Sequence, residues 1–281
     1  MSADLFKKPF FWLSLVLALI WLAILKLPDQ KLHLVFCDVG QGDAVLIYQG
    51  QNQVLLDGGP DSSVLTCLAN HLPFWDRQIE LMVATHPDDD HLTGLIDVLE
   101  RYDVSQLVVN STGKDSAVFK EFKQAVAEEG LKIHFPKKGE KIKLGSLSLM
   151  VLWPQSQADV LGATTLEKAV NELSLVFKLS FGEFDALLPG DISTQVEDKL
   201  DLEEVEVLKV AHHGSKYSTS PEFLFKTSPE LAIVSVGKNP FGHPTEEVLE
   251  RLGSLGIKIL RTDLQGEIEV ITDGQKWGVK R

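Results

Sequence analysis

The sequence has few cysteines: only Cys37 and Cys67 occur in 281 residues. Two cysteines are too few for a disulfide framework or for a cysteine-based zinc module. The sequence therefore excludes small domains that depend on several disulfides or on a cysteine-bound zinc ion. Cys37 falls in a predicted strand and Cys67 in an apolar helical pattern. We therefore expect both to be small buried hydrophobic side chains.

Basic residues are also in deficit, with 27 Lys and Arg against 40 Asp and Glu, for a formal net charge of −13. So acidic a surface repels phosphate backbones at long range, which excludes nonspecific coating of nucleic acid. A phosphate-containing substrate would need a local basic patch or bound metal ions.

The sequence has one long apolar run, residues 10–25, and this run contains no charged residue. Its length is near the lower limit for a membrane-spanning helix. Two lysines precede it, as in a secretory signal, but no small-x-small cleavage site follows. We predict an uncleaved transmembrane signal-anchor within residues 1–30, with a cleaved signal or a buried core helix as alternatives. The remaining domain, 31–281, would then lie outside the cytoplasmic membrane on a single-pass anchor, or be secreted if the signal is cleaved.

The rest of the chain alternates short apolar strands with helices and is long enough for one large α/β domain. Strands followed by a polar loop occur in both halves, which predicts two sheets with helices outside, a four-layer α/β/β/α sandwich. The predicted strands are 31–37, 44–48, 52–57, 79–84, 106–109, 131–135, 142–144, 147–152, 173–179, 184–188, 204–210, 231–236, 257–260, 267–271 and 277–279. Helices are predicted near 62–71, after 91, and at 116–129, 193–200 and 246–252, with a loop or broken helix over 154–168.

The most informative stretch is 85–94, which places two histidines and three aspartates in six consecutive positions after the apolar run 79–84. It lies in a predicted strand-to-helix loop, where α/β sheets commonly carry their chemistry. Imidazole and carboxylate groups are the ligands of zinc, manganese and iron, and this spacing lets them converge on two ions. The alternative is an acidic turn that caps a helix, with Asp90 as the N-cap.

Further polar residues follow other predicted strands: Asp191 after Pro-Gly, the pair His212-His213, and His243. Loops at one edge of a sheet come together in space, so these residues are expected to join the 85–94 loop. Asp57 ends the third strand, either as a turn carboxylate or as a partner that orients a metal-binding histidine.

In this order, Asp57, His86-x-Asp88-x-Asp90-His91, Gly190-Asp191 and His212-His213-Gly214-Ser215 resemble the metallo-β-lactamase superfamily. The chain is most similar to the extracellular hydrolase domain of the ComEC DNA-uptake competence proteins. The shared motifs include Asp-Val-Gly-Gln-Gly-Asp at 38–43, Asn-x-x-Ser-Leu-Val at 171–176 and Gly-His-Pro at 242–244. The match covers about residues 33–272.

The resemblance implies a centre with two divalent ions. His86 and Asp88 would hold one ion, Asp90 and His91 the other, and Asp191 would bridge them. Either His212 or His213 would complete the second ion. The common superfamily pattern has histidine where this chain has Asp88, and another near the place of Asn171. Oxygen ligands at these points favour manganese or magnesium more than an all-histidine zinc site would, although zinc fits as well.

The resemblance also assigns roles around the ions. Asp90, Asp191 and His243 would carry the catalysis, with His243 near the leaving group or a phosphate oxygen. The alternative for His243 is a buried residue that caps the predicted 246–252 helix. Candidate substrate or supporting residues are Asp57, Asn171, Ser215, Lys216, Lys238 and Asp263.

A hydroxide held between two ions would attack phosphorus, which predicts a membrane-anchored phosphodiesterase or nuclease acting on DNA in a competence-related role. In ComEC proteins the hydrolase domain follows a many-helix channel, whereas this sequence has one apolar run, so a separate membrane channel subunit is an expected partner. Alternatives are a hydrolase of another extracellular phosphodiester or ester, and a non-catalytic scaffold of the same fold. Asp88 and the DNA-uptake motifs disfavour β-lactam hydrolysis.

Overall fold

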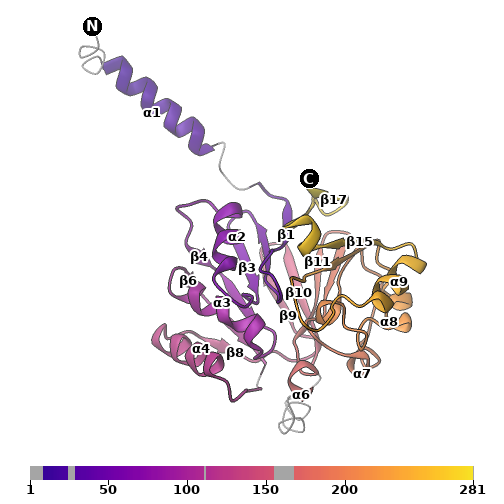
Figure 1. Ribbon diagram of the computed structural model, residues 1–281. Helices are drawn as coiled ribbons and strands as arrows, with labels where there is room; N and C mark the ends of the chain where they lie inside the picture. The colour runs from indigo at the N-terminus through magenta and orange to yellow at the C-terminus, as the bar shows by residue number, and fades with distance from the viewer. Residues whose placement is uncertain (1–8, 25–28, 111, 155–167, 281) are drawn as a thin grey trace.

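The computed structural model describes residues 9–24, 29–110, 112–154 and 168–280. Helix α1 (Pro9–Ile24) contains most of the apolar run, and Figure 1 shows it apart from the rest of the fold. Within the described ranges, no helix has both the length and the apolar character needed to cross a bilayer. The loop or broken helix expected over 154–168 falls almost wholly outside these ranges.

Two mixed sheets form the centre of the fold (Figure 1). The first contains β1 (Leu32–Phe36), β2 (Val45–Gln49), β3 (Asn52–Leu56), β5 (Leu81–Ala84), β7 (Leu107–Val109), β8 (Ile133–His134), β16 (Ile268–Thr272) and β17 (Trp277–Lys280). Its strand order is β17-β16-β1-β2-β3-β5-β7-β8. The last strands of the chain therefore complete the sheet that the first strands begin.

The second sheet contains β9 (Lys141–Leu144), β10 (Leu147–Trp153), β11 (Val176–Phe181), β12 (Phe184–Leu188), β13 (Val207–Lys209), β14 (Leu231–Val234) and β15 (Lys258–Arg261). Its order is β15-β14-β13-β12-β11-β10-β9. A two-stranded pair, β4 (Gln78–Ile79) with β6 (Asp103–Val104), lies outside both sheets.

The helices after α1 are α2 (Ser63–His71), α3 (Asp89–Leu99), α4 (Ala117–Glu128), α6 (Lys168–Asn171), α7 (Thr194–Glu197), α8 (Pro221–Thr227), α9 (Glu246–Ser254) and α10 (Thr262–Gln265), with a 3-10 turn at Ala211–Gly214. Six of them cover the outer faces of the two sheets. Helices α2, α3 and α4 pack on the first sheet, and α7, α8 and α9 pack on the second.

Three apolar cores separate the layers, because successive side chains of a strand point to opposite faces. In β1, Leu34 and Phe36 pack into the core between the sheets, whereas Val35 packs under the helices. In β12, Leu188 faces the first sheet and Leu187 faces the helices of the second. The arrangement is the predicted four-layer α/β/β/α sandwich.

Each sheet has a parallel centre whose strands end on the same side. Strands β3, β5 and β7 run parallel in the first sheet, as do β12, β13 and β14 in the second. The carboxyl ends of neighbouring parallel strands lie along one edge, so the polar loops that follow them are neighbours. The fold thereby brings together residues that are far apart in the sequence.

A close backbone contact fixes the start of α3 against the turn after β3. A Cβ at Gly94 would overlap the carbonyl oxygen of Gly58, so only glycine fits here. The Gly58 N–H donates to the carbonyl of His91 at 2.7 Å, and the Gly94 N–H donates to that of Gly59 at 3.0 Å. This contact sets the position of Asp57 relative to His91.

Cys37 and Cys67 form a disulfide, so the expectation of two separate buried hydrophobic side chains was wrong. Both residues are buried as expected, but the outer face of the chain just after β1 packs directly against α2. The two Cα atoms lie 5.8 Å apart, within the range that a disulfide bridges.

The predicted order of the sheet strands along the chain is confirmed, but β6, α6 and α10 were not predicted, and two further helices differ. Helix α7 ends at Glu197 rather than near 200. Helix α8 was not predicted, although its start has clear signals: Ser220 accepts a hydrogen bond from the N–H of Phe223, and Pro221 occupies the first turn.

Candidate metal centre

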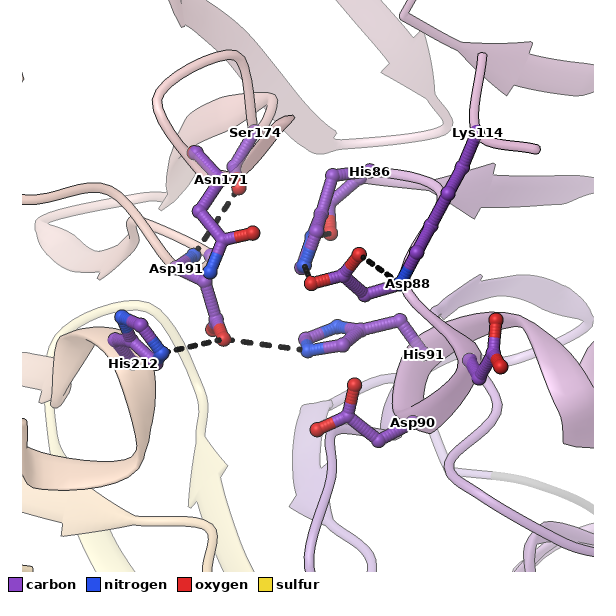
Figure 2. Close-up of polar contacts among 12 residues, drawn as sticks. His86, Asp88, Asp90, His91, Lys114, Asn171, Ser174, Asp191 and His212 are labelled. Atoms are coloured by element: carbon purple, nitrogen blue, oxygen red, sulfur yellow. Dashed lines mark hydrogen bonds and ion pairs between the residues drawn. The ribbon is translucent and has the colours of Figure 1, made fainter. Parts of the chain in front are cut away.

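Seven of the predicted metal-binding residues meet between the two sheets, at the carboxyl ends of their parallel strands (Figure 2). The first sheet supplies the loop after β5 with the first turn of α3, and the second supplies the loops after β12 and β13. The side chains brought together are His86, Asp88, Asp90, His91, Asp191, His212 and His213.

Three of the histidines, all buried, share one arrangement. Each ring bonds through Nδ1 to a protein oxygen: His86 to the Thr85 hydroxyl at 3.0 Å, His91 to Asp57 at 2.8 Å, and His213 to the Ser235 carbonyl at 2.9 Å. Their Nε2 atoms are buried and have no hydrogen-bond partner. A histidine that donates from Nδ1 to the protein leaves the Nε2 lone pair available to a metal ion.

Asp57 orients two of these rings from behind. Its carboxylate accepts hydrogen bonds from the backbone N–H and hydroxyl of Thr85, at 2.8 and 2.7 Å, as well as from His91. The Thr85 hydroxyl donates to Asp57, so its oxygen is left to accept from His86. Asp57 therefore bonds one ring directly and the other through Thr85, contacts that fit the alternative of a residue that orients histidines.

Asp191 lies at the middle of the cluster. Its Oδ2 is 3.5 Å from Nε2 of His91, 3.4 Å from Nε2 of His213 and 4.0 Å from Nε2 of His212. The Asp191 backbone N–H donates to the Ser174 hydroxyl, which fixes the loop after β12. This central carboxylate is where a group shared by two ions would stand.

The two adjacent histidines differ in position. His213 is buried, with Nε2 3.6 Å from Asp90, whereas the His212 side chain is 32% exposed and faces the ring of His243. Both have left-handed backbone, with φ of 49° and 54°, a conformation that costs energy in residues other than glycine. The strained turn points one ring into the cluster and leaves the other at its open side.

Asp88 does not behave as a helix cap. It occupies the N-cap position of α3, but its side chain makes no capping hydrogen bond. One oxygen pairs with Lys114 at 3.0 Å and the other lies 3.6 Å from Nε2 of His86 (Figure 2). Asp90, expected as the N-cap if the stretch were a plain acidic turn, lies inside the helix and faces His213.

The charges of the cluster favour a bound cation. Burial would lower the pKa of His213, but Asp191 and Asp43 outweigh it and raise that pKa to about 10. The pKa of His91 is likewise raised against burial, by Asp191 and Asp57. Asp191 is the carboxylate that lies at Nε2 of both rings, and a negative charge that favours a proton there also favours a metal ion. Burial lowers the pKa of the outer His212 and His243, which keeps both neutral near pH 7.

Two buried residues of the centre were missed by the sequence analysis as site residues. Asp43 ends the 38–43 turn and lies behind the rings, 3.7 Å from Nδ1 of His213 and 3.9 Å from Nδ1 of His91. Lys209, at the end of β13, pairs with Asp43 and lies 3.7 Å from Asp191. The available signal was Lys209 itself, the one charged residue of the otherwise apolar run 207–211.

Asn171 and His243 are near the open side of the centre. Figure 2 shows the Asn171 side chain pointing towards the space between Asp191 and His86. His243 is half-buried, its Nδ1 has no hydrogen-bond partner, and its ring centre lies 5.6 Å from that of His212. The N-cap of α9 is Thr245, so the alternative of His243 as a helix cap does not describe the structure.

The remaining candidates lie outside this set of contacts. The buried Ser215 hydroxyl accepts the Tyr217 N–H within its own turn. Lys216 is exposed, with its ammonium over the ring of Tyr217. Asp263 pairs with Arg261 at 2.6 Å on the surface. Their predicted contacts with substrate stay predictions.

The donor set fits divalent metal ions. Asp43, His91, Asp191 and His213 each offer a ligand atom within 4.8 Å of the others. A second group, Cys67, His71 and Glu267, meets the same criterion, but the sulfur of Cys67 is committed to the disulfide. The unpartnered Nε2 atoms and the central Asp191 make the cluster between the sheets the candidate metal site among the described residues.

Comparison with known proteins agrees with this geometry. Residues 37–238 match the family model of the metallo-β-lactamase superfamily. The chain is 31% identical over 259 residues to ComE operon protein 3 of Bacillus subtilis, covering 83% of this chain and 32% of that protein. It is 28% identical to competence protein ComA of Neisseria gonorrhoeae, covering 86% of this chain and 32% of that protein.

The chain thus spans about a third of the length of these curated relatives. Among solved structures, the metallo-β-lactamase fold protein YhfI of Bacillus subtilis aligns with a TM-score of 0.57 at 9% identity, covering 83% of this chain and 97% of that one. That likeness concerns the fold. The family match over most of the sandwich, together with the histidine and aspartate cluster at its edge, shows that this chain belongs to the metallo-β-lactamase superfamily.

Proposed function

We propose that the protein is a metal-dependent phosphodiesterase that cuts DNA outside the cytoplasm. The observation that carries the proposal is the convergence of two buried, unpartnered Nε2 atoms, those of His91 and His213, on the carboxylate of Asp191, with the unpartnered Nε2 of His86 beside Asp88. Such a set of donors holds hard or borderline divalent ions, and ions held this way activate water towards phosphorus.

We assign the ligands of two ions from these contacts. His86 and Asp88 would hold the first ion, and Asp90, His91 and His213 would hold the second. Asp191 would be available to both. When bound, the ions supply Lewis acidity and a water of lowered pKa. With Asp88 and Asn171 in place of histidines, the first site is rich in oxygen, which favours manganese, with magnesium and zinc as further candidates.

Other side chains around the ions orient the metal-binding residues and transfer a proton. Lys114 neutralises the second oxygen of Asp88, and Asp57 keeps His91 and, through Thr85, His86 in the tautomer that leaves Nε2 free. His243, with its unpartnered Nδ1 at the open side, is placed to bond a phosphate oxygen or to give a proton to the leaving group. Burial lowers the pKa of His243, so its ring is neutral near pH 7 and must take up a proton before it gives one to a leaving group.

The relatives support DNA as the substrate, because two of them are named for competence or its operon. Location outside the cytoplasm is supported by the Cys37–Cys67 disulfide, since disulfides persist in oxidising compartments. In this proposal, residues 1–30 anchor the protein in the membrane and a separate channel subunit is its partner.

A second candidate is hydrolysis of another extracellular phosphodiester or ester. The observation in its favour is the net charge of −13, which repels a long polyanion more than a small substrate.

The test uses the 281-residue chain, stripped of metal and then supplied with manganese, on labelled single- and double-stranded DNA. Asp191→Asn is compared with Asp97→Asn, a surface aspartate of α3 paired with Arg101. We expect cutting that requires metal, is lost in Asp191→Asn and persists in Asp97→Asn. Hydrolysis of bis-p-nitrophenyl phosphate without DNA cutting would favour the second candidate. A protein that binds no metal would contradict both.

A further inference from the structure

A cavity of about 670 Å³ opens beside the metal centre. It lies between α4 and the β7–β8 edge of the first sheet, and its walls include Phe119 and Phe122 of α4 and Phe135 just after β8. Its volume is within the range of about 300–1,000 Å³ typical of small-molecule sites. Of the residues assigned to the metal ions, His86 alone lines this cavity.

The cavity and the metal centre share a wall. His86, whose Nε2 points to the metal-binding carboxylates, also lines the cavity, and so does the adjacent Pro87. A phosphate bound at the centre would therefore have one of its substituents at the cavity mouth. A group that enters the cavity would be a part of the substrate attached to the reacting phosphate.

The lining is mainly apolar and aromatic. Asn110, one of its few polar residues, is already satisfied, because its amide nitrogen donates to the carbonyls of Thr85 and Leu173 and its oxygen accepts from Thr112. The walls thus offer aromatic and aliphatic contact but few free hydrogen-bonding groups. Aromatic walls of this kind bind nucleobases by stacking, with little preference for sequence.

Positive charge lies beside this apolar lining. The Lys123 ammonium lies 5.0 Å from the ring centre of Phe119, and Lys114 pairs with Asp88 where α4 approaches the centre. Lys114 is balanced by Asp88, so Lys123 is the positive charge of the lining that can attract a phosphate of the strand. An acyl chain would gain from the apolar walls but not from this charge.

We propose that the cavity receives one unstacked base of the DNA strand, next to the phosphate that is cut. This inference rests on the proposed phosphodiesterase function. A base inside a duplex is stacked on both sides and paired, and taking it out costs a few kcal/mol. The substrate is therefore single-stranded DNA or a frayed end rather than an intact duplex.

The test measures cutting of short single strands that carry one abasic residue at successive positions around the cut site. Three proteins are compared: the full chain, Phe135→Ala and Phe225→Ala. Phe135 is 44% exposed, so its removal spares the core, and Phe225 is 80% exposed on α8, away from the cavity. We expect one abasic position to raise KM about tenfold, the scale of one lost base–aromatic stack.

Phe135→Ala is expected to raise KM on the normal strand by a similar factor and to remove the penalty of the abasic position. Phe225→Ala is expected to match the full chain. Phe135→Leu keeps apolar volume without an aromatic face and is expected to behave like Phe135→Ala, whereas Phe135→Tyr restores binding. A second measurement uses the Asp191→Asn background and 2-aminopurine at the sensitive position, whose fluorescence is expected to fall on binding.

The inference is overturned if DNA is cut equally well with and without the base at every position, or if duplex is cut as fast as single strand. Either result leaves the proposed function standing. Cleavage of a phospholipid that depends on Phe135, without cleavage of DNA, would assign the cavity to an acyl chain and overturn both proposals.

Discussion

The ammonium group of Lys209 forms an ion pair with the carboxylate of Asp43, and both side chains are almost completely buried behind the metal centre. The pair joins the end of β13 in the second sheet to the 38–43 turn of the first. Lys209 also donates to the Gly190 carbonyl at 3.3 Å and approaches Asp191 at 3.7 Å. A single charge pair thus connects the loops that supply the two halves of the site.

Removal of one partner of this pair is expected to destabilise the protein strongly. Lys209→Met leaves Asp43 as an unpaired buried charge, which should lower the free energy of unfolding by about 3–5 kcal/mol. The double variant Asp43→Asn/Lys209→Met has no unpaired charge and is expected to recover most of that loss. Urea denaturation measures both, with the exposed Lys226→Met as control. A double variant as unstable as the single one would contradict this explanation.

The two adjacent histidines are expected to differ in metal binding. His213 is buried between Asp90 and Asp191, whereas His212 lies at the open side. His213→Ala should therefore lose one of two bound ions, and His212→Ala should keep both. Metal analysis of the dialysed proteins gives the stoichiometry, and circular dichroism confirms that each variant is folded. Equal loss in both variants would show that the assignment to His213 is wrong.

Acid should weaken the buried hydrogen-bond network around His33, which is remote from the metal centre. Nδ1 of His33 bonds to Glu269 at 2.6 Å and Nε2 to Asp29 at 2.9 Å. Burial would raise the pKa of Glu269, but hydrogen bonds from His33 and Lys280 lower it from 4.5 to about 2. Because the folded pKa is below the unfolded one, this contribution is complete above about pH 4.5 and is lost as the pH falls towards 2.

The measurement compares the melting temperature of wild type and Glu269→Gln across this pH range, which cancels the titration of other groups. We expect the variant to be less stable by the largest margin above pH 4.5 and the two curves to meet near pH 2. The pKa of His33 is raised against burial by Glu269 and Asp29, so its contribution is complete below pH 6.5 and declines only at higher pH. The exposed Glu222→Gln serves as control. A constant difference at every pH would rule out the ion pair as the cause.

Reduction of the disulfide should destabilise the domain. Cys37 and Cys67 are 30 residues apart, and closing a loop of this length stabilises the folded state by about 3–4 kcal/mol in the chain-entropy treatment. Denaturation with and without dithiothreitol measures the effect, and Cys37→Ala/Cys67→Ala should be insensitive to the reductant. Two free thiols in the native protein recovered from an oxidising compartment would contradict the bond.

The sequence predicted the sandwich and most of the metal centre, because both depend on local patterns. Alternating apolar strands and the 85–94 loop have recognisable spacing, and residues such as Asp57 and Asp191 follow their strands directly. Neighbouring parallel strands end at the same edge of a sheet. These residues can therefore be expected to lie together even when the packing of side chains is unknown.

What the sequence did not predict depends on contacts between distant segments. The Asp43–Lys209 pair joins residues far apart in the chain, and only the docking of the two sheets brings them together. The Cys37–Cys67 bond depends on how α2 lies on the first sheet. The choice between His212 and His213 depends on a left-handed turn that the residue types do not suggest.

The sheet order has a consequence for dividing the protein in two. A cut between β10 and β11 would leave His86 and His91 on one fragment and Asp191 and His213 on the other. Strands β16 and β17 would go with the second fragment, although they complete the sheet of the first by pairing with β1. Each fragment would lack strands of its main sheet, so metal uptake would return only when the two fragments recombine. The domain could therefore serve as a split reporter, in which cation binding reports the association of two separately expressed fragments.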